Sequence, residues 1–181
     1  MNLRFSIALA AFSIVCATSV QASAQEQDAT KPSKTPKLHV EAQSGPIVGR
    51  VADVAFFGAD VGAGLVVAAS DSVSFDAEFF YAGATTDAGL GVHWGGARTT
   101  LMWTPSRFRI GAGVDLLYFG MERVTENSAL THPGFGAHGH LGFDVIELDG
   151  GHALEIFAQP EANWLFGAPL LNASLELAAR F

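Results

Sequence analysis

The chain has 181 residues, of which 49% are hydrophobic, and its formal net charge at pH 7 is −8. Its mean hydropathy of +0.29 is high for a water-soluble protein, yet no run of about 18 apolar residues is present to form a membrane-spanning helix. These properties argue against a helical membrane protein, and the acidic balance argues against a nucleic-acid-binding protein.

Residues 1–24 have the features of a secretory signal peptide. Arg4 supplies a positive charge, a short apolar core follows it, and the segment ends in the small-x-small pattern Ala-Ser-Ala before Gln25. We therefore expect export and cleavage before Gln25; an N-terminal membrane anchor is the alternative. The single cysteine, Cys16, would be removed, leaving no thiol for a disulfide or a thiolate-bound metal.

Residues 25–45 are polar, and Pro32 and Pro36 discourage regular structure there. We expect a flexible periplasmic lead-in. Its lysines could contact an anionic polymer such as the cell wall, but a solvated spacer is the simpler interpretation.

From about residue 46 onward, apolar and polar residues alternate with a period of two, and turn residues interrupt the pattern. Eight strands are predicted in chain order, at 47–57, 61–69, 73–81, 88–103, 108–118, 135–145, 154–161 and 171–181. The first is the least regular, because Arg50 and Asp53 have opposite parity and cannot share a face.

The fourth predicted strand, 88–103, contains a change of parity. Its apolar residues run through Val92 and Trp94 and then shift by one position to Leu101. One extra residue at the Gly-Gly pair 95–96 would explain the shift as a β-bulge and would keep the number of strands even. A two-glycine hairpin is the alternative.

An even number of strands is typical of single-chain bacterial outer-membrane barrels. The predicted fold class is all-β, an eight-stranded antiparallel up-and-down transmembrane β-barrel over residues 46–181. Both termini would lie on the periplasmic side, with turns at 70–71, 104–107 and 148–151. The outer loops would be 58–60, 83–87, 121–134 and 166–170, of which only 121–134 is long.

Two features favour a barrel in lipid over a soluble barrel. No lysine follows Lys37, so the polar face lacks the residue that water-exposed sheets usually carry. Aromatic residues lie near strand ends, as in the girdles of membrane barrels. At the outer rim we expect Tyr81, Tyr118, Phe135 and Trp164, and at the inner rim Trp103, Phe108 and Phe181.

The chain ends in Leu-x-Leu-Ala-Ala-Arg-Phe, which resembles the C-terminal signature that the outer-membrane assembly machinery recognises, with Phe181 as the assembly signal. Residues 103–120 are similar to the turn and strand common in small OmpA-like and OmpW-like barrels. The resemblance covers 45–181 and implies location in the bacterial outer membrane, assembly by that machinery, and contact with membrane lipid and lipopolysaccharide. It indicates no particular subfamily and assigns no functional residues.

Polar residues of the predicted inner face form a candidate lumen network, because charge in a confined space must be paired. Its members are Asp76, Glu78, His93, Arg109, Asp115, His138, His140, Asp144, Glu155, Glu161, Glu176 and Arg180. The network could act as a gate or selectivity filter, or as a structural plug. Eight strands enclose an interior that side chains fill, which disfavours a general pore.

His138 and His140 share one face of a strand, where two imidazoles could bind a metal. We favour the hydrogen-bonded network instead and expect no metal or cofactor. Some barrels of this size modify lipid A with a His and a Ser at the lipid-facing surface. Here the strand histidines, His93 included, are predicted to point inward, so we expect no catalytic residues.

The sequence therefore predicts an integral outer-membrane barrel, monomeric and non-enzymatic, with a structural or surface-contact role through loop 121–134. A narrow channel and a lipid A-modifying enzyme are the alternatives.

Overall fold

The structure is a computed structural model, and it describes residues 37–123, 126–148, 152–165 and 168–181, with the side chains of 122–131 excepted. The predicted signal peptide, 1–24, and residues 25–36 of the predicted lead-in lie outside this part of the chain. In the described residues, no helix is long and apolar enough to cross a membrane.

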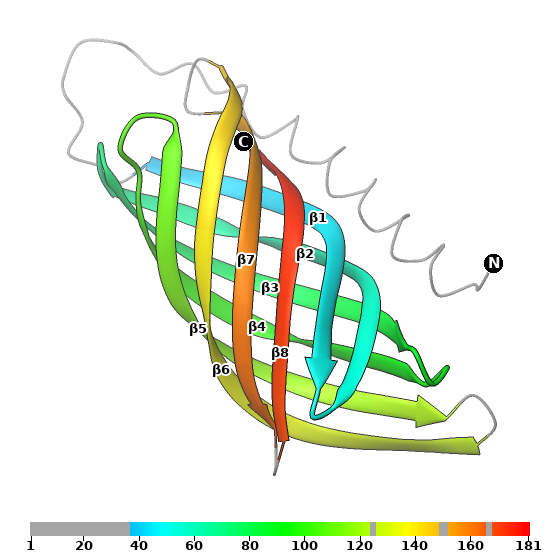
Figure 1. Cartoon of the computed structure of the whole chain (residues 1–181). Helices are drawn as coiled ribbons and strands as arrows, with labels where there is room; N and C mark the ends of the chain where they lie inside the picture. Colours follow the sequence, from blue (N-terminus) through cyan, green and yellow to red (C-terminus); the bar gives the residue numbers. More distant parts are fainter. Residues whose placement is uncertain (1–36, 124–125, 149–151, 166–167) are drawn as a thin grey trace, which may run out of the picture.

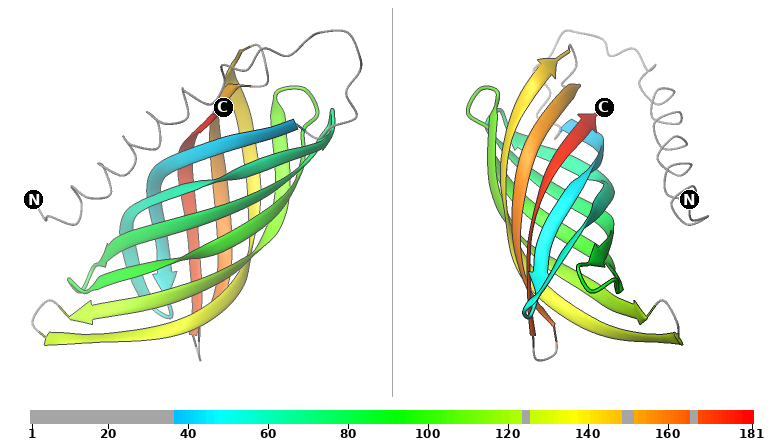
Figure 2. Two further views of the ribbon diagram at one scale, coloured as in Figure 1. Left: turned by 180° about the vertical axis from the view of Figure 1, so that it is seen from behind. Right: turned by 45° about the vertical axis from the view of Figure 1, so that its right-hand side comes forward.

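Eight strands form the described chain: β1 (Lys37–Val51), β2 (Val54–Ser70), β3 (Val73–Thr86), β4 (Gly91–Trp103), β5 (Phe108–Arg123), β6 (Glu126–Glu147), β7 (Ala153–Leu165) and β8 (Ala168–Arg180). Each strand pairs antiparallel with the next one along the chain, and β1 pairs with β8. The sheet therefore closes into a barrel of tilted strands (Figure 1, Figure 2). The predicted fold class is confirmed.

The seam between β1 and β8 closes the barrel. Its rungs run from Glu41–Arg180 to Val51–Leu170. Phe181 extends the seam by one rung, because its N–H donates to the carbonyl of Val40 at 2.8 Å and its carbonyl accepts from the N–H of Val40 at 3.0 Å. The last residue of the chain thus takes part in closing the wall.

We name the two ends of the barrel by the position of the chain termini. The terminal end, at the top of Figure 1, holds the start of β1, the end of β8 and the connections β2–β3, β4–β5 and β6–β7. The far end holds the other four connections. The turn predicted at 104–107 is present between β4 and β5.

The predicted start of the barrel at residue 46 is wrong, because β1 begins at Lys37. Glu41 and Gln43, which belong to the predicted lead-in, are instead buried and point into the lumen. The first turn lies at residues 52–53 and not at 58–60. Gly58 lies inside β2, where a Cβ would be only 2.1 Å from a β3 carbonyl oxygen, so it marks a close strand contact and not a turn.

The β-bulge predicted in β4 is also wrong. β4 pairs with both of its neighbours in unbroken register from residue 91 to 103. Val92 and Trp94 are buried inside the barrel, and the residue between them, His93, lies on the outer face. The apparent shift in parity arose because apolar residues occupy the inner face of β4 toward the far end.

The predicted long loop at 121–134 is mostly strand. β5 continues to Arg123, and β6 begins at Glu126. Residues 126–133 of β6 pair with β5 beyond the last described rung between β6 and β7, Gly134–Leu165. β6 therefore extends past β7, while β5 stays paired with β4 as far as Glu122, and the two strands form a hairpin at the lower right of Figure 1.

The two faces of the wall differ as the alternation predicts. Leu175 faces outward and is 57% exposed, while its neighbour Glu176 faces inward and is 2% exposed. The same contrast separates Ile110 from Arg109. Of the aromatic residues predicted for the two rims, six face outward and are each more than half exposed: Tyr81, Tyr118, Phe135, Trp164, Trp103 and Phe108.

Candidate functional site: the filled lumen

Side chains fill the lumen in two chemically different halves. Toward the far end lies a cluster of buried apolar residues, which we call the apolar plug: Ile47, Val51, Phe56, Phe80, Ala82, Val92, Trp94, Leu117, Phe119, Leu165 and Leu170. Toward the terminal end lies the ionic half, where arginines, carboxylates and histidines meet. Both lie on inner faces of the same strands.

Trp94 is a central side chain of the apolar plug. It is fully buried, its ring lies 5.2 Å from that of Phe56 in an edge-on contact, and it stacks on Phe119 at 6.4 Å. These three aromatic residues come from β2, β4 and β5, so they fill the lumen from different parts of the wall. Aromatic pairs of this geometry stabilise a core by about 0.5–1.5 kcal/mol beyond their burial.

Arg109 organises the ionic half at the terminal end. Its guanidinium donates to Glu41 at 2.9 Å, to Asp76 at 2.9 Å and to Glu155 at 2.6 Å. These carboxylates come from β1, β3 and β7, so one buried cation joins four strands across the lumen. Arg180 adds a second cation here, 2.9 Å from Asp144.

Arg98 holds a second group of carboxylates nearer the apolar plug, with longer contacts. It lies 3.3 Å from Glu161, 3.5 Å from Asp60 and 3.9 Å from both Glu78 and Asp115. Its guanidinium carbon also lies 3.8 Å from the ring centre of Phe80. A cation above an aromatic face is stabilised by the ring quadrupole. Arg98 therefore links the ionic half to the apolar plug.

His138 belongs to a linear chain of hydrogen bonds. Its Nδ1 lies 2.9 Å from Oδ1 of Asp115, and its Nε2 lies 2.8 Å from Oγ1 of Thr100. Because the carboxylate only accepts, Nδ1 donates, and in the neutral ring Nε2 accepts from the threonine hydroxyl. Gly113 leaves the space for this ring, since a Cβ there would be 2.5 Å from Cε1 of His138.

His140 points into a different set of contacts. Its Nε2 lies 2.7 Å from Oε1 of Glu155, and its ring stacks on Phe157 at 4.3 Å. The two histidines, although on one face of β6, are thus held by separate partners and do not form a chelate. Among the described residues, no group of three or more His, Cys, Asp and Glu side chains is placed to hold a metal ion.

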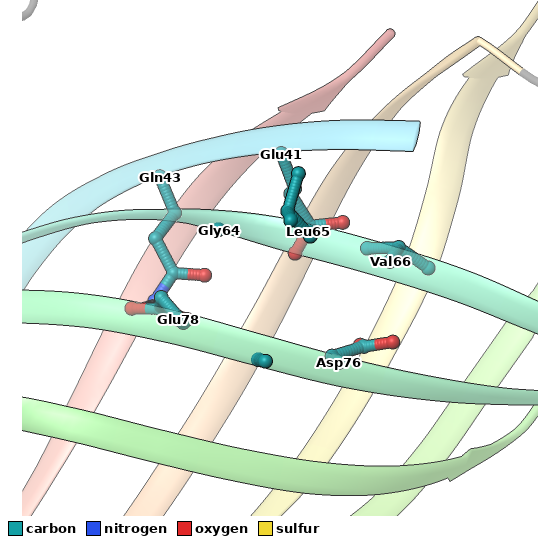
Figure 3. Close-up of a pocket in the computed structure, with 8 residues that line it drawn as sticks. Glu41, Gln43, Gly64, Leu65, Val66, Asp76 and Glu78 are labelled. Atoms are coloured by element: carbon teal, nitrogen blue, oxygen red, sulfur yellow. Dashed lines mark hydrogen bonds between the residues drawn. The ribbon is translucent and has the colours of Figure 1, made fainter. Parts of the chain in front are cut away.

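A small polar cavity lies between the inner faces of β1, β2 and β3 (Figure 3). Its volume is about 10 Å³, room for about one water. Gln43 and Glu78 point toward one another across it, and the Gln43 amide donates to Glu78 at 2.9 Å. Glu41 and Asp76 line the other side. The lumen is therefore nearly filled even at this point.

The lumen has a large excess of acidic groups. Three arginines, Arg98, Arg109 and Arg180, face nine carboxyl groups, which are Glu41, Asp60, Asp76, Glu78, Asp115, Asp144, Glu155, Glu161 and Glu176. Each arginine is shared by two or more carboxyl groups. Loss of Arg98 or Arg109 would therefore remove a shared cation from three or more buried carboxyl groups at once.

The structure places the predicted network residues inside the barrel with one exception. Those inside are Asp76, Glu78, Arg109, Asp115, His138, His140, Asp144, Glu155, Glu161, Glu176 and Arg180. His93 instead lies on the outer face, where its ring stacks against Tyr81 at 6.4 Å. Its placement follows from the unbroken register of β4, which turns Val92 and Trp94 inward.

Three charged lumen residues were missed by sequence reasoning. Glu41 lay in the predicted lead-in and Asp60 in a predicted loop. Arg98 was detectable, because the outward parity of Ala97 and Leu101 requires the residue at 98 to point inward. The strand pattern thus contained the signal for Arg98 but not for the two acids.

The described fold is similar to solved structures of outer-membrane proteins. One is Neisserial surface protein A, with a TM-score of 0.54 and 13% identity over 79% of this chain and 95% of that chain. Another is Ail, the attachment invasion locus protein of Yersinia pestis, solved with the heparin analogue sucrose octasulfate, with a TM-score of 0.59 and 10% identity over 80% of this chain and 99% of that chain. No protein-family model matches the chain, and neither does any curated protein.

At these identities the similarity concerns the fold alone. The chain has the fold of a small eight-stranded outer-membrane β-barrel. Its lumen is half apolar and half ionic.

Proposed function

We propose that this chain is an exported integral protein of the bacterial outer membrane whose barrel is sealed along its axis, and that its role is structural or surface contact. The observation that carries the proposal is the filled lumen, with the apolar plug toward one end and the arginine–carboxylate network toward the other. An eight-stranded barrel is just wide enough for side chains to fill it. The apolar side chains of the outer face match the hydrocarbon core of a bilayer, which supports the membrane location.

A planar-bilayer recording tests the seal. The purified barrel should insert without producing conductance steps, while a general porin in the same bilayer gives a positive control. Reproducible unitary steps from the wild-type barrel would overturn the sealed-barrel proposal in favour of the narrow channel. A detergent-partitioning experiment tests the location independently, since a membrane barrel leaves the aqueous phase.

The enzyme alternative has one geometric point in its favour. The hydrogen bonds that join Thr100 to His138 and His138 to Asp115 have the arrangement of a nucleophile, a base and an acid that orients the base. All three side chains are buried in the lumen, however, where a lipid substrate outside the wall has no contact with the hydroxyl. We therefore expect the mass spectrum of lipid A to stay unchanged when the protein is expressed. A mass change that Thr100→Val abolishes would establish the enzyme instead.

The β5–β6 hairpin is our candidate for surface contact. It extends beyond the last β6–β7 rung at the far end, and the name of the similar Ail structure refers to attachment. Replacing residues 122–131 by a short turn should leave the barrel folded. Cells that express the shortened protein should bind less to the external surface that the hairpin contacts. Equal binding by the shortened protein would remove the hairpin from this role.

We infer that Phe181 serves as the signal for the outer-membrane assembly machinery. It lies at the seam that assembly must close. Phe181→Ala should lower the amount of folded barrel in the outer membrane, measured by heat-dependent gel migration. Phe143→Ala, at an outward aromatic residue of β6 away from the seam, is the matched control; equal losses in both variants would contradict a signalling role.

A further inference from the structure

Two histidines that lie far apart in the sequence meet at the terminal end of the barrel. His39 is near the start of β1, and His152 directly precedes β7. β8 lies between these two strands in the wall, and Phe181 at its end pairs with Val40 of β1. The two imidazole rings therefore approach each other across the end of β8, with their centres 6.5 Å apart and their planes at 88°.

Backbone hydrogen bonds hold both histidines in place. His39 pairs with Val66 of β2 in an unbroken register. The carbonyl of His152 accepts a hydrogen bond from the N–H of Leu148 at 2.9 Å, which joins the end of β6 to the start of β7. Both histidine side chains are partly exposed, so an ion can reach them from solution.

The hydrogen bonding of the two rings resembles that of metal ligands. The imidazole of His39 donates a hydrogen bond to the backbone of Phe181. In metal sites such a bond fixes the ring and directs its other nitrogen at the metal. Nδ1 of His152 is buried and has no hydrogen-bond partner among the described residues. A buried polar atom without a partner is costly, and a bound cation would supply one.

The separation of the rings and the surrounding charge also suit a cation. Zinc binds an imidazole nitrogen at about 2.0–2.1 Å, which places the centres of two ligating rings about 5–6.5 Å apart. Lys37 and Arg180 are positive neighbours of His39. Lys37 is exposed to solvent, which screens its charge. Arg180 lies 2.9 Å from Asp144 and 3.8 Å from Glu41, so acidic groups offset its charge.

We propose that His39 and His152 bind Zn²⁺ at the terminal end, with water completing its coordination. The ion would tie the start of β1 to the start of β7 across the end of β8. Imidazole nitrogen is a preferred ligand of zinc, whereas calcium and magnesium prefer oxygen. An ion that binds the folded barrel but not the unfolded chain stabilises the fold by mass action. The site is independent of the structural or contact role proposed above.

Isothermal titration calorimetry with zinc chloride tests the site on the full barrel in detergent, purified without a polyhistidine tag. His93→Ala is the matched control, because it removes one imidazole from the outer face, where His93 stacks on Tyr81. We expect the wild type and His93→Ala to bind Zn²⁺ equally. His39→Ala and His152→Ala should each bind it at least about tenfold more weakly, since the loss of even an outer-shell partner costs about 10–100-fold.

The midpoint of urea unfolding provides a second measurement. Zn²⁺ should raise the midpoint of the wild type and of His93→Ala, and it should leave the midpoints of His39→Ala and His152→Ala unchanged. Heat-dependent gel migration shows whether each variant folds, and His39→Gln replaces His39→Ala if the alanine variant does not. Absence of Zn²⁺ binding by the wild type would overturn the proposal. Equal binding by the wild type and both site variants would do so too, because the metal would then lie elsewhere.

Discussion

The two halves of the lumen are sealed by different physical means. The apolar plug is held by close packing around Trp94, which stacks and makes edge contacts with its aromatic neighbours. The ionic half is held by a few arginines that each serve several carboxylates, such as Arg109 with its contacts of 2.6–2.9 Å. Packing spreads its contribution over many contacts, whereas the ionic half depends on single cations.

This difference predicts unequal sensitivity to substitution. A buried ion pair is costly to break, because the remaining charge has neither water nor a partner. A packed cluster loses stability in proportion to the cavity that remains. We therefore expect the most severe single-residue effects in the ionic half, although its polar residues were the easier ones to predict.

The largest effect is expected for Arg109→Ala. The substitution leaves Glu41, Asp76 and Glu155 without their shared donor, and we expect a loss of about 3–5 kcal/mol in the free energy of unfolding. Urea unfolding in detergent micelles measures it. Arg107→Ala is the matched control, since this arginine is half-exposed and 3.6 Å from Glu147, and it should change little. Equal midpoints for the two variants would refute the central role of Arg109.

Trp94→Ala should destabilise the apolar plug by about 3 kcal/mol, because it removes a large, fully buried side chain and leaves a cavity. The barrel should nevertheless remain non-conducting, since the ionic half still closes it. Trp164→Ala, on the outer face of β7, is the control and should have a smaller effect. Channel activity in Trp94→Ala would mean that the plug alone provides the seal.

Thr100→Val tests the hydrogen-bond chain through His138. The valine has a similar shape but leaves Nε2 of the buried imidazole without its partner at 2.8 Å. We expect a loss of about 1–2 kcal/mol, measured by urea unfolding. Thr99→Val, one residue away on the outer face of β4, is the natural comparison. If neither substitution changed the free energy of unfolding, the hydrogen bonds from Thr100 through His138 to Asp115 would contribute nothing measurable to stability.

The smallest effect is expected for Arg50→Ala at the β1–β2 turn. Arg50 pairs with Asp53 at 2.8 Å, but both side chains are mostly exposed, so solvent screens the pair. The unfolding midpoint should not move measurably. A clear shift would show that an exposed ion pair at the far end contributes to stability, contrary to the expectation that the large contributions come from the two halves of the lumen.

The direction in which each side chain points was predictable wherever the inward residues of a strand are polar. In β8 and β7, acids and amides alternate with leucine and alanine, so the inward residues Glu155, Glu161 and Glu176 followed directly from the period of two. In β4 the same rule failed, because Val92 and Trp94 are apolar but point inward. The misplaced bulge and the misplaced His93 both follow from that one assumption.

The period-two alternation and the absence of lysine after Lys37 were enough by themselves to define an antiparallel eight-stranded barrel with an apolar outer face, because a closed wall between hydrocarbon and a narrow interior requires that pattern. Only the tertiary structure decided that the far half of the interior is apolar, that Arg98 and Glu41 belong to the ionic half, and that His93 lies outside. The reason is that an apolar residue can be buried against lipid or against other side chains, and local sequence does not distinguish these two environments.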